Sequence, residues 1–110
     1  MIGGQEYLEE ADRYSEEALY EEPWNPPFQG TKGSLLIEMG QPEVGIPMVQ
    51  KALEFNTDPR SKAFNACYLA LGELRRDNRE ESNRYWQFAR AFDPSCLLLD
   101  RVEHEFKNAL

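Results

Sequence analysis

The residue types that act as nucleophiles or metal ligands are few in this chain, and their spacing matches no known kind of site. They include two cysteines, Cys67 and Cys96, and a single histidine, His104. A zinc site needs several such ligands at short spacings, and the two cysteines do not form a C-x-x-C pair. The chain also lacks a phosphate-binding glycine loop, a nucleophile elbow and an H-E-x-x-H motif. The sequence therefore predicts no catalytic residue, no metal and no cofactor, and we expect a protein that is not an enzyme.

Negative charge is concentrated at the start of the chain. Residues 1–23 hold −7 of the net charge of −8, from eight acidic side chains and Arg13, while residues 24–110 hold only −1. An acidic surface repels a phosphate backbone, so we expect no nucleic-acid partner. No apolar run approaches the roughly 20 residues that span a membrane, and the first residues lack a signal-peptide pattern. We expect a cytoplasmic protein with reduced cysteines and no membrane contact.

Small residues recur at a helical spacing in three parts of the chain. The pairs stand seven residues apart and are Ala11 with Ala18, Gly45 with Ala52, and Ser82 with Ala89. The later member of the pair recurs after 34 residues and then after 37. A period near 34 residues is typical of stacked helical hairpins. Apolar residues elsewhere recur at steps of three and four, so we expect an all-α fold in which short connections make neighbouring helices antiparallel.

Proline, glycine and asparagine mark the expected ends of the helices. Asp58-Pro59 and Asp93-Pro94 each provide an N-cap acceptor before a proline that suits the first helical turn. Gly40 and Asp77-Asn78 are suited to ending a helix in the left-handed conformation. Pro47 lies one turn inside a helix, where we expect it to kink the helix or delay its start. The six expected helices span about 4–22, 27–39, 42–55, 59–76, 79–92 and 95–109.

This pattern resembles the tetratricopeptide-repeat family over about residues 4 to 109. Ala18, Ala52 and Ala89 match the small residue of that repeat's second helix, and Gly40 and Asp77 take the place of its turn glycine. The resemblance implies a short right-handed α-solenoid that forms a single domain, residues 1–110. It would contain an unpaired acidic helix at 4–22, hairpins at 27–55 and 59–92, and a terminal capping helix at 95–109.

The first helices of the two hairpins depart from the family pattern. The usual early aromatic is replaced by Gln29 and Ala66, and the later tyrosine is replaced by Leu36 and Glu73. A generic helix bundle is therefore the alternative fold.

The resemblance places function on the concave face, which the first helices of the hairpins line. The implied partner-binding groove comprises Ser34, Ile37, Phe64, Cys67, Leu71, Leu74, Leu98 and Arg101. Family members that grip the acidic tail of a chaperone use lysine, arginine and asparagine in such places, so the apolar lining disfavours that mode. We expect a protein–protein interaction module whose groove binds an amphipathic helix or an apolar extended segment of a protein partner.

Other interpretations stay open. A stripe of Phe and Leu at helical spacing is more often core than binding surface, and apolar faces can also join two copies in a homodimer. The chain could instead be an accessory domain of an enzyme or of a larger complex. The arginines around the last turn are either a salt-bridged surface or a contact for an acidic partner, and they are Arg75, Arg76, Arg79, Arg84 and Arg90.

Overall fold

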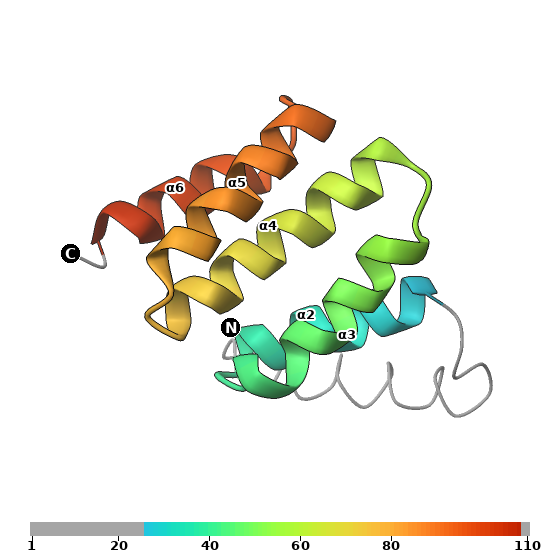
Figure 1. The fold of residues 1–110 in the computed structure, drawn as a ribbon, viewed down its shortest axis with the longest axis horizontal. Coiled ribbons are helices and arrows are strands. Elements are labelled where there is room, and N and C mark those ends of the chain that lie inside the picture. Colours follow the sequence, from blue (N-terminus) through green and yellow to red (C-terminus); the bar gives the residue numbers. More distant parts are fainter. Residues whose placement is uncertain (1–25, 109–110) are drawn as a thin grey trace, which may run out of the picture.

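The computed structural model describes residues 26–108, which form five α-helices joined by short connections (Figure 1). The helices are α2 (Pro26–Glu38), α3 (Pro42–Phe55), α4 (Pro59–Arg75), α5 (Arg79–Phe92) and α6 (Leu98–Asn108). Residues 26–108 contain no strand, so the prediction of an all-α fold is confirmed for this range. The expected helix at 4–22 lies outside the described residues.

Helix α4 lies at the centre of the arrangement. α2 and α3 form one antiparallel hairpin, α4 and α5 form the next, and α6 packs on both α4 and α5 (Figure 1). α4 contacts each of the other four helices. Within residues 26–108, by contrast, the first hairpin reaches α5 and α6 only through long side chains such as Gln50 and Glu38. The packing of the helices therefore follows their order in the chain.

The two hairpin turns have the same backbone geometry. At the first turn Gly40 has a φ of +84°, and its N–H donates a hydrogen bond to the carbonyl oxygen of Ile37. The N–H of Gln41 donates to the carbonyl oxygen of Leu36 at 2.8 Å, which completes a Schellman motif. The same pair of bonds recurs at the second turn, where Asp77 has a φ of 65°. Gly40 and Asp77 are thus equivalent residues, as the sequence predicted, and both adopt the left-handed conformation that ends a helix.

Each hairpin brings its helices together where small residues face each other. A Cβ atom added at Gly33 would lie 2.8 Å from the carbonyl oxygen of Gly45, which is closer than side chains normally approach a backbone. The equivalent residues of the second hairpin, 37 positions later, are Ala70 and Ser82. Ser82 is 1% exposed, and its Oγ donates a 2.7 Å hydrogen bond to the carbonyl oxygen of Ala70. The small residues at these positions therefore allow the two helices of each hairpin to approach closely.

The two Asp-Pro sequences adopt different local structures. Asp58 caps α4, because its Oδ2 accepts hydrogen bonds of 3.1 Å from both the backbone N–H and the Oγ of Ser61. Asp93 bonds instead to Ser95, only two residues ahead, through the backbone N–H at 3.1 Å and Oγ at 2.7 Å. Such an Asx turn forms a loop rather than a helix start. The prediction that the last helix begins near residue 95 is therefore wrong, and α6 begins at Leu98.

Pro47 does not delay the start of its helix. α3 begins at Pro42 and continues through Pro47 to Phe55. Proline removes the hydrogen bond to the carbonyl oxygen four residues earlier, which here is that of Glu43 in the exposed first turn. Water can hydrogen-bond to that carbonyl oxygen, so Pro47 does not prevent the helix from starting at Pro42. The prediction of a delayed start is therefore wrong.

The core is built around α4. Ten of its residues are buried, and those with no exposed surface include Ala66, Cys67, Leu69 and Leu71. Apolar side chains of the other helices pack against them, and these include Ile37, Ile46, Val49, Ala89 and Val102. A helix buried on several sides must be apolar around most of its surface, which explains why α4 lacks a clear polar face.

Candidate binding site

Most of the predicted groove residues lie in the core. Ile37, Cys67 and Leu71 have no exposed surface, Leu74 is 7% exposed and Ser34 is 6% exposed. Ile37, Cys67 and Leu71 belong to the hydrophobic core cluster, and all five residues present almost no surface to a partner in this structure. This burial corrects the expectation that these five residues line an open groove. The stripe on α4 belongs largely to the core, which was the alternative interpretation.

Three of the predicted groove residues keep some exposed surface. Phe64 is 46% exposed, while Leu98 and Arg101 are partly buried. The Phe64 ring lies 5.2 Å from that of Tyr68, one turn further along α4, in a tilted arrangement. Burial, followed by the nearby carboxylate of Glu38, raises the pKa of the Tyr68 hydroxyl. Of the predicted groove residues in the described range, Phe64 is therefore the most exposed, and its aromatic partner Tyr68 was not among those predicted.

Ion pairs hold the ends of α2, α4 and α6 together. Arg101 of α6 pairs with Glu38 of α2 at 2.6 Å and lies 3.8 Å from Glu105. Arg75 of α4 pairs with the same Glu105 at 3.3 Å and donates a 2.7 Å hydrogen bond to the carbonyl oxygen of Ile37. Arg101 is therefore occupied by carboxylates of this chain, and its role here is to position three helices.

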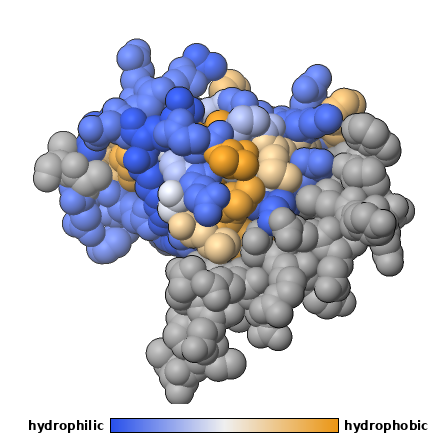
Figure 2. Space-filling view, turned by 90° about the horizontal axis from the view of Figure 1, so that it is seen from below, coloured by the Kyte–Doolittle hydropathy of each residue, from blue (hydrophilic) through white to orange (hydrophobic). Residues whose placement is uncertain are grey.

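Exposed apolar side chains are spread over several elements. Those at least 46% exposed are Val44, Phe55, Phe64, Phe88 and Leu97, the last at 94%. Figure 2 shows one face of the molecule, on which apolar residues gather near the centre while hydrophilic residues cover the left-hand part of the described surface. Single exposed apolar residues are common on protein surfaces, so exposure alone selects none of the five. Phe64 and Leu97 differ from the other three because each also borders a cavity with polar walls.

The cavity beside Phe64 lies where α2, the α3–α4 connection and the first turns of α4 meet. It has a volume of about 310 Å³, and its lining consists of Gly30, Thr31, Asn56, Arg60, Ser61, Phe64 and Asn65. Gly30 helps to keep it open, since a Cβ atom there would lie 3.2 Å from both Ala52 Cβ and Asn65 Oδ1. A volume near 300 Å³ is at the lower end of the range for small-ligand pockets.

Two side chains of this cavity, Asn65 and Arg60, provide hydrogen-bond donors. Asn65 is 5% exposed, and its buried Nδ2 has no hydrogen-bond partner. Arg60 makes no hydrogen bond or ion pair with the described part of the chain. The hydroxyl of Ser61 already donates to Asp58. No Asp or Glu occurs among the described lining residues, so the cavity presents an amide donor and a positive charge.

Two further cavities lie between α5 and α6. Their volumes are about 490 Å³ and 200 Å³, and both are lined by Trp86 and Glu103. The walls carry both signs of charge, with Arg90 and Lys107 alongside Asp100 and Glu103. The indole Nε1 of Trp86 donates a 3.0 Å hydrogen bond to the carbonyl oxygen of Leu99, so its polar group is satisfied. Among the described residues, these cavities contain no buried donor or acceptor that lacks a partner.

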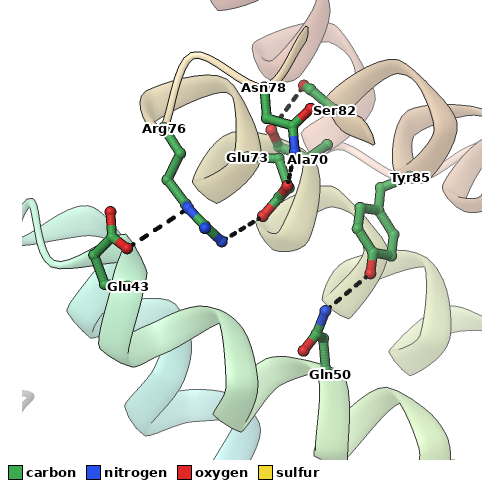
Figure 3. Close-up of polar contacts among 8 residues, drawn as sticks. All are labelled: Glu43, Gln50, Ala70, Glu73, Arg76, Asn78, Ser82 and Tyr85. Atoms are coloured by element: carbon green, nitrogen blue, oxygen red, sulfur yellow. Dashed lines mark hydrogen bonds and ion pairs between the residues drawn. The ribbon is translucent and has the colours of Figure 1, made fainter. Parts of the chain in front are cut away.

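The five arginines near the second turn all have partners. Figure 3 shows Arg76 between the carboxylates of Glu73 at 3.1 Å and Glu43 at 3.7 Å, while Asn78 Nδ2 donates to Glu73 at 2.8 Å. Arg84 pairs with Glu81 and Arg75 with Glu105. Arg79 lies over the ring of Phe106 and Arg90 over that of Trp86. These contacts favour a salt-bridged surface over a contact for an acidic partner.

The two cysteines lie close to each other, whereas the histidine contacts Asn108 of its own helix. Cys67 is buried in α4 and Cys96 lies in the α5–α6 connection, while His104 Nε2 and Asn108 Nδ2 are 2.9 Å apart on α6. Burial, with a smaller contribution from Cys96, raises the pKa of the Cys67 thiol far above its ordinary value. No group of metal-binding side chains occurs in residues 26–108, and no helix in that range is long and apolar enough to cross a membrane.

Comparisons with family models, with curated proteins and with solved structures gave no match for this chain.

Arg60 and Asn65 were missed at the level of sequence. The helical spacing assigned Phe64, Cys67 and Leu71 to one face of α4, and Asn65 stands one residue from Phe64 in that pattern. Only the approach of Gly30 from α2 makes Asn65 part of a cavity. The available signal in the sequence was the polar side chain of Asn65 within an apolar stretch of the helix. That signal does not show what kind of ligand would bind there.

Proposed function

We propose that this chain is a non-enzymatic protein–protein interaction module that binds a peptide segment of a partner beside α4. The site comprises the aromatic pair Phe64 and Tyr68 together with the adjacent cavity. The supporting observation is that a half-exposed aromatic ring borders a cavity with an unused buried donor. Such a combination suits a peptide with an apolar side chain and a nearby acceptor.

The proposed architecture is a short α-solenoid similar to tetratricopeptide repeats. Its support lies in the 37-residue offset that relates the two hairpins at three places. Gly33, Gly40 and Gly45 of the first hairpin have the same roles as Ala70, Asp77 and Ser82 of the second. α6 packs on both helices of the second hairpin, as α4 packs on both helices of the first, although α4 contacts mainly α3 whereas α6 contacts α4 more than α5.

The function can be tested by selecting peptides against the purified chain. A displayed library of random dodecapeptides is enriched on the wild type, and the selected peptides are then titrated by fluorescence anisotropy. We expect Phe64→Asp to weaken their binding by about tenfold or more, because truncating a central aromatic contact commonly costs 1–3 kcal/mol. Far-ultraviolet circular dichroism should stay unchanged, since Phe64 is half-exposed.

Phe88→Asp is the matched control for this experiment. Phe88 has the same 46% exposure but lies on α5 and does not line the cavity. We expect the selected peptides to bind this variant as they bind the wild type. Equal loss of binding in both variants, or a library without enriched peptides, would contradict the proposed site.

Self-association is a second candidate function, favoured by the position of Leu97. This side chain is 94% exposed at the edge of the 490 Å³ cavity between α5 and α6. If a second copy covers this edge, Leu97→Ser should lower the mass measured by light scattering from dimer to monomer. A wild-type chain that is monomeric at all tested concentrations would remove this candidate.

A further inference from the structure

We infer that the cavity between α2 and α4 is a carboxylate-binding subsite. The inference rests on the proposed function, because it names the chemical group that a bound peptide places there. The two recognition groups are the Nδ2 of Asn65 and the guanidinium of Arg60. Phe64 forms the adjacent apolar wall, on which the neighbouring side chain of the peptide rests.

The first step concerns the buried amide. Nδ2 of Asn65 is shielded from solvent and has no partner, although the residue is only 5% exposed. Burying a donor without an acceptor is unfavourable by about 1–3 kcal/mol, so proteins rarely keep one without a reason. Because Asn65 lines the cavity, a ligand oxygen placed there would supply the missing acceptor.

The second step concerns charge. Arg60 is exposed at the start of α4, lines the same cavity and makes no direct ion pair with a described carboxylate, although its charge acts on Asp93 from a distance. The described lining contributes no acidic side chain, so its formal charge is that of Arg60 alone. An anion is therefore preferred over a neutral acceptor, since charge-assisted hydrogen bonds are about twice as strong as neutral ones.

The third step separates a carboxylate from a phosphate. Only one cation lines the cavity, and the carboxylate of Asp58 is held beside it through Ser61. A phosphate dianion has twice the negative charge of a carboxylate, so the carboxylate of Asp58 would repel it more strongly. The single guanidinium of Arg60 would balance only half of that charge. A carboxylate has one charge and two oxygens, which matches one amide donor and one guanidinium.

The shape of the cavity depends on Gly30. Its missing side chain leaves the space next to Asn65 open, and a Cβ atom would already be at 3.2 Å from Oδ1 of Asn65. A larger residue at this helical position would narrow the cavity next to Asn65. Gly30 therefore keeps space open beside Oδ1 of Asn65, and this role adds to its place in the packing of α2 against Ala52.

Four small probes test the inference on the full chain labelled with ¹⁵N. N-acetyl-phenylalanine offers an α-carboxylate, its amide is the uncharged counterpart, N-acetyl-aspartate α-amide offers a side-chain carboxylate, and the fourth is inorganic phosphate. We expect both acids to shift the side-chain NH₂ signal of Asn65, with Kd values at least tenfold lower than that of the uncharged amide. The acid with the lower Kd shows whether the bound carboxylate of a peptide comes from its C-terminus or from an acidic side chain. Equal affinity for acid and amide, or tighter binding of phosphate, would overturn the inference.

Variants of the two recognition groups complete the experiment. We expect Arg60→Gln to raise the Kd of the acid that binds more tightly by about threefold to tenfold. Asn65→Ser should raise that Kd by at least tenfold. Asn83→Ser and Arg84→Gln are matched controls, because both residues are exposed on α5 and neither lines this cavity. If Asn65→Ser fails to fold, Arg60→Gln decides, since Arg60 is exposed. Unchanged affinity in Arg60→Gln would contradict the inference.

The results also separate this inference from the proposed function. Library peptides that bind through Phe64 but contain no required carboxylate would overturn the subsite and leave the interaction module standing. Acids that bind the cavity while the library yields no peptide would support the subsite and remove the proposed function.

Discussion

Oγ of Ser82 donates a 2.7 Å hydrogen bond to the backbone carbonyl oxygen of Ala70 across the second hairpin. That carbonyl oxygen belongs to a helix interior, so the bond is made in addition to the regular helical pattern. It requires the two helix backbones to be close, which a small side chain at each position permits. In the first hairpin Gly33 and Gly45 occupy the equivalent positions.

Changes at this contact should lower stability in both hairpins. We expect Ser82→Ala to lower the free energy of unfolding by about 1 kcal/mol, because a buried hydrogen bond is lost. Gly45→Ala should lower it by about 1–3 kcal/mol, because the added Cβ meets the backbone of Gly33. Urea denaturation followed by circular dichroism measures both values. Gln87→Ala, on the exposed face of α5, is the control and should stay within about 0.5 kcal/mol of the wild type.

A substitution in the second hairpin turn should increase the stability of the chain. Asp77 has a φ of 65°, a conformation that residues other than glycine adopt at a cost. We expect Asp77→Gly to raise the free energy of unfolding by about 0.5–1 kcal/mol. Gly40→Ala, the reciprocal change at the first turn, should lower it by about 1 kcal/mol. A lower thermal midpoint for Asp77→Gly would show that the carboxylate stabilises the turn by more than the backbone strain costs.

The two thiols should differ in reactivity. Burial raises the pKa of Cys67, so little thiolate forms there at pH 8, whereas Cys96 lies partly exposed in the α5–α6 connection. We expect iodoacetamide to modify Cys96 first, with Cys67 protected until the chain is unfolded in urea. Mass spectrometry of tryptic peptides gives both rates. Modification of Cys67 at the rate of Cys96 in the native chain would mean that α4 opens readily.

The Asx turn before α6 should make stability depend on pH. Hydrogen bonds from Ser95, assisted by the charge of Arg60, lower the pKa of the Asp93 carboxyl below its ordinary value in the folded chain. The contribution of the ionised carboxylate is therefore complete above the unfolded pKa and is lost as pH falls through the lower, folded value. We expect the stability difference between the wild type and Asp93→Asn to shrink over that acidic range. Thermal midpoints measured from pH 6 to pH 2 follow it, and a difference that grows toward low pH would contradict the turn geometry.

Most helix boundaries were predictable because they depend on local chemistry. A proline stands in the first turn of α3 and of α4. Gly40 follows the end of α2, and Asp77 follows the end of α4. Each of these residues acts within a few positions of the helix boundary. The start of α6 was not predictable, since Asp93-Pro94 has the same sequence as Asp58-Pro59. The serine that each aspartate binds lies three residues ahead in one case and two in the other.

The site was less predictable than the fold because it depends on which faces other helices cover. Periodicity placed Phe64, Cys67 and Leu71 on one side of α4, but α4 is in contact with helices on several sides and only Phe64 remains exposed. The cavity arises where Gly30 approaches Asn65, across 35 positions of sequence. Contacts between distant residues of this kind are set by tertiary packing, which a single sequence does not specify.

The central position of α4 has a consequence for how ligand binding is felt by the molecule. Phe64 and Asn65 belong to the helix that contacts all four other described helices, so α4 cannot detach without releasing the whole core. A ligand held by these residues therefore stabilises the domain against global opening rather than local fraying. Amide hydrogens of α4 should exchange slowest, and the bound probe should slow exchange in helices that it never touches.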